Sequence, residues 1–185
     1  MHTSIYLATS LDGFIARADG AIDWLPSGDD TGEDYGYQAF FASVDLLVMG
    51  RTTYDLVQSF GAWPYGDKPV VVLSQRPLTI PAELAERVTV MAGAPQELAE
   101  RLAARGFRHA YIDGGQTIQR FLAAGLIQRM ILTRVPVLLG QGIPLFGPLP
   151  AERWWQHVAT RSYANGLVQS EYVQRAAGGI YLASH

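Results

Sequence analysis

Cysteine is absent from the 185-residue sequence. Disulfide bonds, thiolate metal ligands and a cysteine nucleophile are therefore excluded. The 14 Lys and Arg against 17 Asp and Glu give a net charge of −3, so no basic field favours nucleic acid. No apolar run approaches the roughly 20 residues that cross a bilayer, and the start, MHTSIYLATS, lacks the pattern of a signal peptide. We expect a cytoplasmic protein that binds neither nucleic acid nor membrane.

Histidine is also scarce. The four histidines are scattered, and no two are spaced to share one helix face, so we expect no metal site. His109 and His157 stand at the starts of apolar stretches, where a role at a strand edge is favoured over catalysis.

Segments rich in Val, Ile, Leu and Tyr alternate along the chain with helical patterns, without an internal repeat or a low-complexity linker. The sequence therefore predicts a single domain over residues 1–185. The predicted strands are 4–9, 45–50, 69–74, 87–91, 109–114, 129–138, 155–164 and 167–175. The predicted helices are 35–43, 52–59, 94–105 and 117–124.

The strands differ in pattern along the chain. The middle ones are short and almost wholly apolar, as expected when helices cover both faces of a parallel sheet. The last two alternate polar and apolar residues, and the ANG between them is a hairpin signal. We expect an α/β fold whose central sheet of about eight strands is mixed and mostly parallel, with flanking helices and an antiparallel C-terminal hairpin.

Three of the predicted strands end in residues suited to anions: GRTTY, LSQR and DGGQT. Ligands of open α/β sheets bind beyond the carboxyl ends of the strands, where helix N-termini present free N–H groups. Gly114 and Gly115 would let a pyrophosphate approach the backbone, and Arg51 and Arg76 have the fork geometry that suits phosphate. The alternatives are a plain glycine turn and solvated surface arginines. Neither the Gly-x-Gly-x-x-Gly fingerprint nor a Walker lysine motif is present.

The first strand leads into a long loop, ATSLDGFIARADGAIDWL, with two Asp-Gly turns and several apolar residues. A wide surface loop is one interpretation. A lid over a ligand bound at the strand ends is the other.

The order of these motifs resembles the dihydrofolate reductase-like superfamily. It is most similar to the reductase (RibD C-terminal) domain of the bifunctional riboflavin-biosynthesis deaminase–reductase. ATSLDGFIA, VMGRTTYD, VLSQR, IDGGQTIQRFL and PVLLGQGIPLF match in that order, from Ser4 to about Arg175. The zinc motif of the deaminase half is absent, and PSGDDTGEDYGYQAFF departs from the riboflavin-type pattern.

The resemblance implies NADPH as the cofactor. It places Ala8 and Ile15 beside the nicotinamide, Gly140 in a late segment that closes over it, and Ser74 and Arg76 around the adenosine 2′-phosphate. The residues implied for the other phosphates are Gly50, Arg51, Thr52, Thr53, Gly114, Gly115, Gln116 and Thr117.

Dihydrofolate reductases carry an acidic residue on their first helix that pairs with the amino-pyrimidine ring. Counting back from Gly50 without a gap places Asp34 at this position, and a carboxylate there can accept two hydrogen bonds from a ring edge. The alternative is that Asp34 caps the helix, in competition with Asp29, Asp30 and Glu33. Water would deliver the proton that the reduction needs, or Asp34 would help to deliver it.

These features favour an NADPH-dependent reductase of a small heterocycle, similar to 5-amino-6-(5-phosphoribosylamino)uracil reductase. A pterin or dihydrofolate-type reductase, a non-catalytic NADPH-binding protein and a nucleotide-free interaction protein are the alternatives. A phosphorylated substrate would need further cations, for which Arg17 and Arg134 are candidates. Similar reductase domains pair two chains through the C-terminal end. The C-terminal end of this chain carries more aromatic surface than one face of a sheet would bury, in Trp154, Trp155, Tyr163 and Tyr172. We therefore expect a homodimer with an isologous contact, and the alternative is that these aromatic residues belong to the core.

Overall fold

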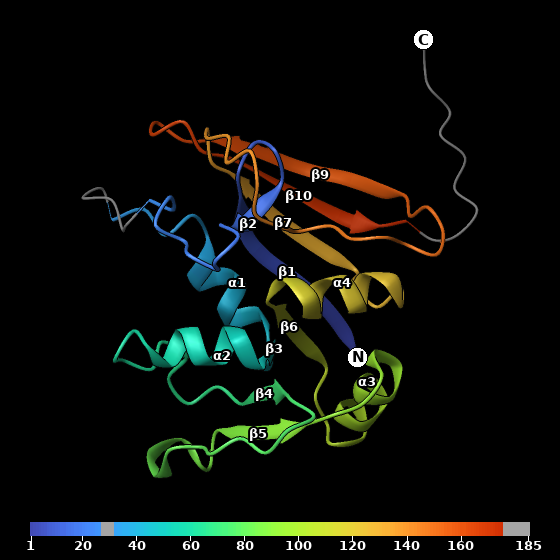
Figure 1. Cartoon of the computed structure of the whole chain (residues 1–185). Coiled ribbons are helices and arrows are strands. Elements are labelled where there is room, and N and C mark those ends of the chain that lie inside the picture. Colours follow the sequence, from blue (N-terminus) through green and yellow to red (C-terminus); the bar gives the residue numbers. More distant parts are fainter. Residues whose placement is uncertain (27–31, 176–185) are drawn as a thin grey trace.

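The protein is described by a computed structural model that covers residues 1–26 and 32–175 (Figure 1). The strands of its main sheet are β1 (His2–Thr9), β3 (Leu46–Gly50), β4 (Val70–Leu73), β5 (Val88–Met91), β6 (His109–Asp113), β7 (Arg129–Arg134), β9 (Trp155–Ser162) and β10 (Val168–Gln174). A separate two-stranded sheet consists of β2 (Phe14–Ala16) and β8 (Ile143–Pro144). The helices are α1 (Tyr37–Ser43), α2 (Arg51–Gln58), α3 (Pro95–Ala104) and α4 (Gly115–Ala123), with a short 3-10 helix, η1 (Ala82–Leu84).

The eight strands of the main sheet follow the order β5-β4-β3-β6-β1-β7-β10-β9. The strands from β5 to β7 are parallel to one another, whereas β10 is antiparallel to both β7 and β9. This arrangement confirms the expected mixed, mostly parallel sheet and its C-terminal hairpin. The hairpin turns through Asn165 and Gly166, and Gly166 has the positive φ of 86° that glycine adopts without strain.

The predicted elements differ most from the observed ones in two places, and elsewhere their ends shift by one or two residues. The strand predicted over 129–138 ends at Arg134. The N–H of Val135 still donates to the carbonyl of Thr9, but Pro136 has no N–H to offer the sheet. The strands β2 and β8 were not predicted, since each has only two or three residues and neither shows a period.

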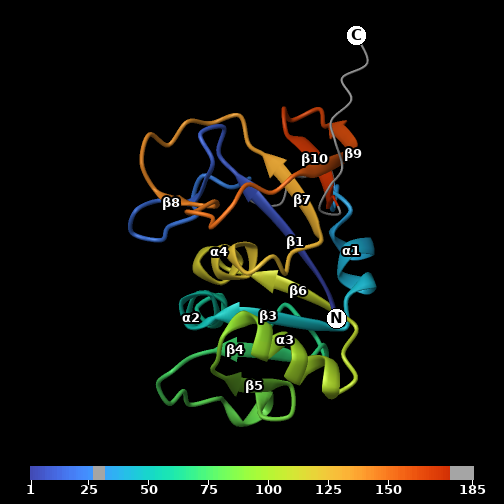
Figure 2. The ribbon, with the colours of Figure 1, turned by 90° about the vertical axis from the view of Figure 1, so that its right-hand side faces the viewer.

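Helices cover both faces of the sheet, and Figure 2 shows α1 and α4 on opposite sides of the central strands. Alternation along β6 sends Ile112 into the core beneath α3 and α4, where Leu98 and Leu102 are fully buried. Tyr111 points the other way, into the core beneath α1 and α2. Within residues 1–26 and 32–175, no helix is long and apolar enough to cross a membrane.

Candidate functional site

Two helices begin side by side at the carboxyl edge of the sheet. Because β3 and β6 are neighbours, with Met49 beside Asp113, α2 and α4 both start at this edge. Their N-cap residues are Gly50 and Gly114, and among the described residues no side chain caps either helix. The first N–H groups of both helices are therefore available to an anion at one place.

The glycines at these helix starts allow close packing between the two segments. An added Cβ at Gly50 would lie 3.0 Å from the Thr117 hydroxyl, and one at Gly114 would overlap the Thr53 hydroxyl. Gly114 also has φ +86°, a conformation that side chains disfavour. An added Cβ at Gly115 would lie 2.7 Å from Cδ1 of Ile15. The double glycine is thus required by the chain itself, and its contact with a pyrophosphate stays a prediction.

The two arginines predicted to bind the cofactor lie at one turn. Nη1 of Arg51 donates to the carbonyl of Pro77 at 3.3 Å, and its Nε lies 3.5 Å from Asp55. The turn after β4 is closed by Ser74, whose hydroxyl donates to the carbonyl of Arg76 at 2.7 Å. Arg76 is exposed. Two positive charges therefore stand next to the start of α2.

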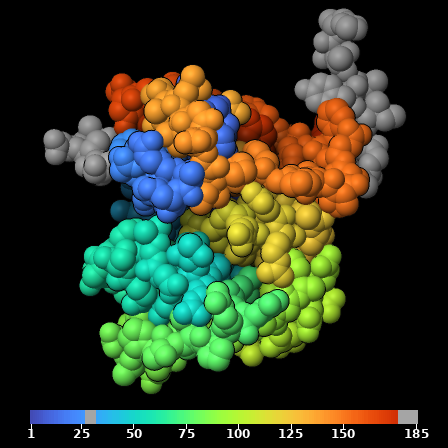
Figure 3. Space-filling model, in the orientation of Figure 1, coloured from blue at the N-terminus to red at the C-terminus, as the bar shows by residue number. Residues whose placement is uncertain are grey.

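The long N-terminal loop packs against the late segment that contains Gly140. Leu11 donates its N–H to Val137, and Leu145 donates its N–H to Gly13. The short strands β2 and β8 pair between these contacts. On the surface in Figure 3, the blue atoms of the N-terminal loop adjoin the orange atoms of the late segment. Together the two segments form a rim against the start of α4.

The N-terminal side of this rim holds Ile15, which is predicted to lie beside the nicotinamide, and the other side holds Gly140, from the segment predicted to close over it. Ile15 and Ile143 both approach Gly115. Ala8 lies on β1, one residue before this strand ends, and it stands opposite Thr133 of β7. Of the predicted phosphate residues, Thr52 and Gln116 are exposed at the two helix starts, and Thr117 is buried. The fold therefore brings the cofactor segments together at one edge.

Asp113 is a candidate functional residue that the sequence reasoning missed. It ends β6 directly before Gly114, whose N–H donates to its Oδ1 at 2.8 Å. Burial raises the pKa of this carboxyl, and hydrogen bonding from Gly114 opposes the shift only in part. Asp113 follows Tyr111 by two residues, so it shares the face covered by α1. The signal was an acid at the end of an otherwise apolar strand.

Tyrosine rings lie near this carboxyl. Burial, and after it the charge of Asp113, raises the pKa of Tyr37 to about 12. The same two causes raise the pKa of the buried Tyr65. The face of the sheet under α1 thus combines a half-buried acid with aromatic surface near the helix starts.

Asp34 lies at the start of α1, and its carboxylate is engaged there. Oδ1 accepts the N–H of Gly36 at 2.9 Å, and Oδ2 accepts the N–H of Gln38 at 3.0 Å. Hydrogen bonding, first from Gln38 and then from Gly36, lowers the pKa of Asp34. This geometry matches the capping alternative. The pairing of Asp34 with a substrate stays a prediction, and the competing Asp29 and Asp30 lie outside the described residues.

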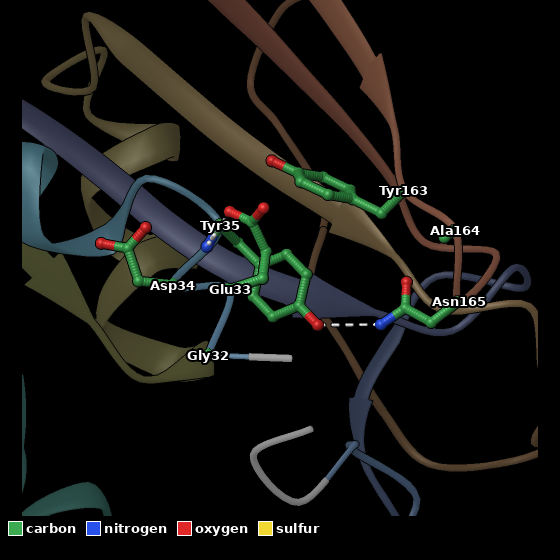
Figure 4. A pocket seen from close by; sticks show the side chains of 7 residues that line it. All are labelled: Gly32, Glu33, Asp34, Tyr35, Tyr163, Ala164 and Asn165. Carbon is green, nitrogen blue, oxygen red and sulfur yellow. Dashed lines mark hydrogen bonds between the residues drawn. The ribbon is translucent and has the colours of Figure 1, made fainter. Parts of the chain in front are cut away.

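A pocket of about 370 Å³ adjoins Asp34, between the segment before α1 and the tip of the C-terminal hairpin (Figure 4). The Asn165 amide donates to the hydroxyl of Tyr35 at 2.8 Å across this pocket. The pocket lies on the α1 side of the sheet, whereas α4 packs on the other.

The two arginines considered for a substrate phosphate are placed differently. Arg17 forms a two-pronged pair with Asp23, at 2.6 Å from Nε and 3.1 Å from Nη2. Its donors on that side are therefore already used. Arg134 is exposed at the carboxyl end of β7. Both arginines are exposed, and Arg134 is the one that lies at the carboxyl end of a strand of the main sheet.

The comparisons with known proteins agree with this arrangement. The family model of the RibD C-terminal domain matches residues 3–169. The uncharacterized protein YwjB of Bacillus subtilis (strain 168) is 35% identical over 93% of this chain and 97% of its own length. A crystal structure from Shewanella sp. PV-4, of a protein provisionally named for riboflavin biosynthesis, has 41% identity and a TM-score of 0.89, over 95% of this chain and 100% of that one.

A more distant likeness concerns the fold alone. Dihydrofolate reductase from Enterococcus faecalis, complexed with NADP(H) and RAB-propyl, has 18% identity and a TM-score of 0.63, over 95% of this chain and 97% of that one. This likeness shows the dihydrofolate reductase-like fold. Family membership rests instead on the family model, which matches most of the chain. The chain belongs to the RibD C-terminal domain family.

Proposed function

We propose that the protein is an NADPH-dependent reductase of a small heterocyclic substrate, similar to 5-amino-6-(5-phosphoribosylamino)uracil reductase. The proposal rests on the starts of α2 and α4, which lie at one edge of the sheet with uncapped N–H groups. Arg51, and Arg76 in the turn after β4, lie beside these N–H groups. Such a set of donors suits a dinucleotide that carries three phosphates.

The residues present fit this cofactor. The N–H groups at the starts of α2 and α4 would hold the pyrophosphate, and Arg51 and Arg76 would hold the 2′-phosphate. The rim that carries Ile15 and Gly140 would exclude water from the nicotinamide end. The cofactor supplies the hydride, and the protein supplies orientation and a dry cleft.

The proton would come from Asp113. Its carboxyl lies directly before the double glycine, and its raised pKa favours the protonated form that a general acid needs. Asp34 is the candidate for binding the edge of the substrate ring, provided that the substrate displaces its two hydrogen bonds to α1.

A dihydropterin is the alternative substrate, and a cofactor-binding protein without turnover is the alternative function.

Cofactor titration tests the proposal first. We expect calorimetry to show NADPH binding more tightly than NADH. The double variant Arg51→Ala/Arg76→Ala should weaken NADPH binding by roughly ten- to a hundredfold, since a charge-assisted contact contributes about 1.5–3 kcal/mol. NADH binding should hardly change, because NADH lacks the extra phosphate.

Arg105→Ala is the matched control, because Arg105 is an exposed arginine beyond the end of α3. Equal weakening of both cofactors in the double variant would place the two arginines elsewhere. Oxidation of NADPH with the phosphoribosylamino-pyrimidine, and separately with a dihydropterin, then distinguishes the two substrates. Binding of NADPH without turnover of either would favour the non-catalytic alternative.

A further inference from the structure

Asp12 joins the two segments of the rim through its carboxylate. Oδ2 accepts the N–H of Gly140 at 2.7 Å, and Oδ1 accepts the N–H of Leu139 at 3.2 Å. Ser10, which is fully buried, donates its hydroxyl to the same Oδ1 at 2.5 Å. Three donors from two distant parts of the chain thus converge on one acidic side chain.

The geometry of the late segment explains why a carboxylate fits there. Gly140 has φ +75°, and this left-handed turn directs two successive N–H groups towards one point. Such a backbone concavity binds anions, and here the chain provides its own. The hydroxyl of Ser10, with the N–H groups of Gly140 and Leu139, lowers the pKa of Asp12, in keeping with an ionised carboxylate.

The contact reaches the cofactor edge through a short path. Ser10 follows the last residue of β1, and its hydroxyl also accepts the N–H of Phe14 in β2 at 3.0 Å. On the other side, Gly140 lies three residues before Ile143, whose side chain approaches Gly115. Asp12 therefore joins the loop after β1 to the segment that leads into β8, where Ile143 lies close to the start of α4.

We propose that Asp12 is a positioning residue that latches the late segment, residues 137–142, onto the N-terminal loop and so completes the rim of the cofactor cleft. The part of this proposal that concerns the cofactor rests on the proposed function. Because both oxygens of Asp12 are engaged within the rim, its role is to hold the backbone of the rim. Pairing with a substrate ring would break the latch.

Asp12→Asn tests the latch with almost no change in size. The amide presents an NH₂ group where Oδ2 accepted the Gly140 N–H, so one contact becomes a clash of two donors. We expect the amides of Leu139 and Gly140 to exchange at least about tenfold faster with deuterium. The dissociation constant of NADPH should rise by about tenfold, while the preference for NADPH over NADH is kept, because Arg51 and Arg76 are untouched.

Asp19→Asn is the matched control. Asp19 lies on the same N-terminal stretch, and its Oδ1 also accepts a backbone N–H, that of Ala21 at 2.9 Å, within its own turn. This variant should leave both amide exchange at 139–140 and NADPH affinity within twofold of the wild type. Asp12→Glu keeps the charge and should restore part of the affinity that Asp12→Asn loses.

Unchanged exchange at Leu139 and Gly140 in Asp12→Asn would overturn the latch. Faster exchange with unchanged NADPH affinity would overturn its role at the cofactor. Failure of the wild-type protein to bind NADPH would overturn the proposed function instead. In that case the exchange comparison still decides whether Asp12 latches the rim.

Discussion

Single residues at the carboxyl edge of the sheet combine structural and chemical demands. Gly114 shows this most clearly, because it needs a positive φ and leaves no space for a Cβ beside Thr53. At its neighbour Asp113 the demand is chemical, because desolvation disfavours the charge that the side chain carries in water. A half-buried acid with a raised pKa, held next to a helix start, is more readily explained by chemistry than by stability.

Asp113→Asn should abolish proton donation while it keeps the size of the side chain. We expect turnover to fall by about a hundredfold or more, the usual range for loss of a general acid. NADPH affinity should stay within twofold. The pH profile of kcat decides the role. Wild-type kcat should fall as pH rises through the pKa of Asp113, and that limb should be missing in Asp113→Asn.

The same variant has a consequence for stability that needs no substrate. The folded-state pKa of Asp113 lies above its unfolded value, so the native state loses stability as pH rises from about 3.8, the unfolded value, through the folded pKa. Asp113→Asn removes this loss. Urea unfolding at several pH values should show the free energy of unfolding of the variant rising relative to that of the wild type as pH rises. Parallel plots of this free energy against pH would contradict the raised pKa of Asp113.

At the scale of elements, α1 depends on a side chain for its start. Gly36, its N-cap, has φ +82° and offers no side-chain oxygen, so Asp34 supplies both acceptors from two residues earlier. The helix has only seven residues, and a short helix gains little from its own hydrogen bonds. Its position over Tyr6 and Tyr111 therefore depends on this cap and on the packing of Phe40.

Asp34→Ala should lower the unfolding midpoint by about 2–4 °C, and Asp34→Asn should lower it by less, because the amide keeps one of the two acceptor oxygens. The pKa of Asp34 is depressed by its hydrogen bonds, so its contribution is present above its unfolded pKa and is lost as pH falls through the folded value. Thermal scans at a series of pH values below neutral test this, and a deficit in Asp34→Ala that does not shrink as pH falls below about 3.8 would contradict the cap.

If Asp34 also holds a substrate, Asp34→Asn separates the two roles. One of the two capping acceptors is kept, whereas the charge that accepts two donors from a substrate ring is lost. Turnover should then fall by roughly two orders of magnitude, on the scale of a lost charged hydrogen bond of about 3 kcal/mol. Unchanged turnover in Asp34→Asn would leave Asp34 as a cap alone.

On the scale of the whole molecule, the sheet ends in an open edge. The outer strand, β9, pairs only with β10 in the described part of the chain, and all its residues except Trp155 are exposed. Val158 and the preceding Trp154 are 51% and 53% exposed. Long exposed edge strands favour pairing with another chain. This surface is where we propose that two copies associate.

Light scattering at micromolar concentration should give about twice the 20.2 kDa of one chain. Val158→Lys places a charge in the middle of β9 and should shift the mass to that of one chain without unfolding it. Phe60→Lys is the control, because Phe60 is equally exposed, at 55%, beyond α2. A wild-type mass near 20 kDa would sink the homodimer.

The sequence was enough to predict the fold, because periodicity and turn residues are local signals. The apolar middle strands, the alternating last two and the ANG turn specify a mixed sheet with a terminal hairpin. The strand ends that carry Gly50, Arg51, Arg76 and Gly114 could be assigned to one edge, since parallel strands share a carboxyl edge.

Only the tertiary structure decided what the individual side chains at that edge contact. The latch of Asp12 spans 128 residues to Gly140, and no local pattern encodes such a distance. The partial desolvation of Asp113 follows from neighbours on other strands and helices, while in the sequence it resembles any acid before a turn. The fold thus follows from local patterns of the chain, and the chemistry of its site follows from long-range contacts, because desolvation and hydrogen bonding act between residues that only folding brings together.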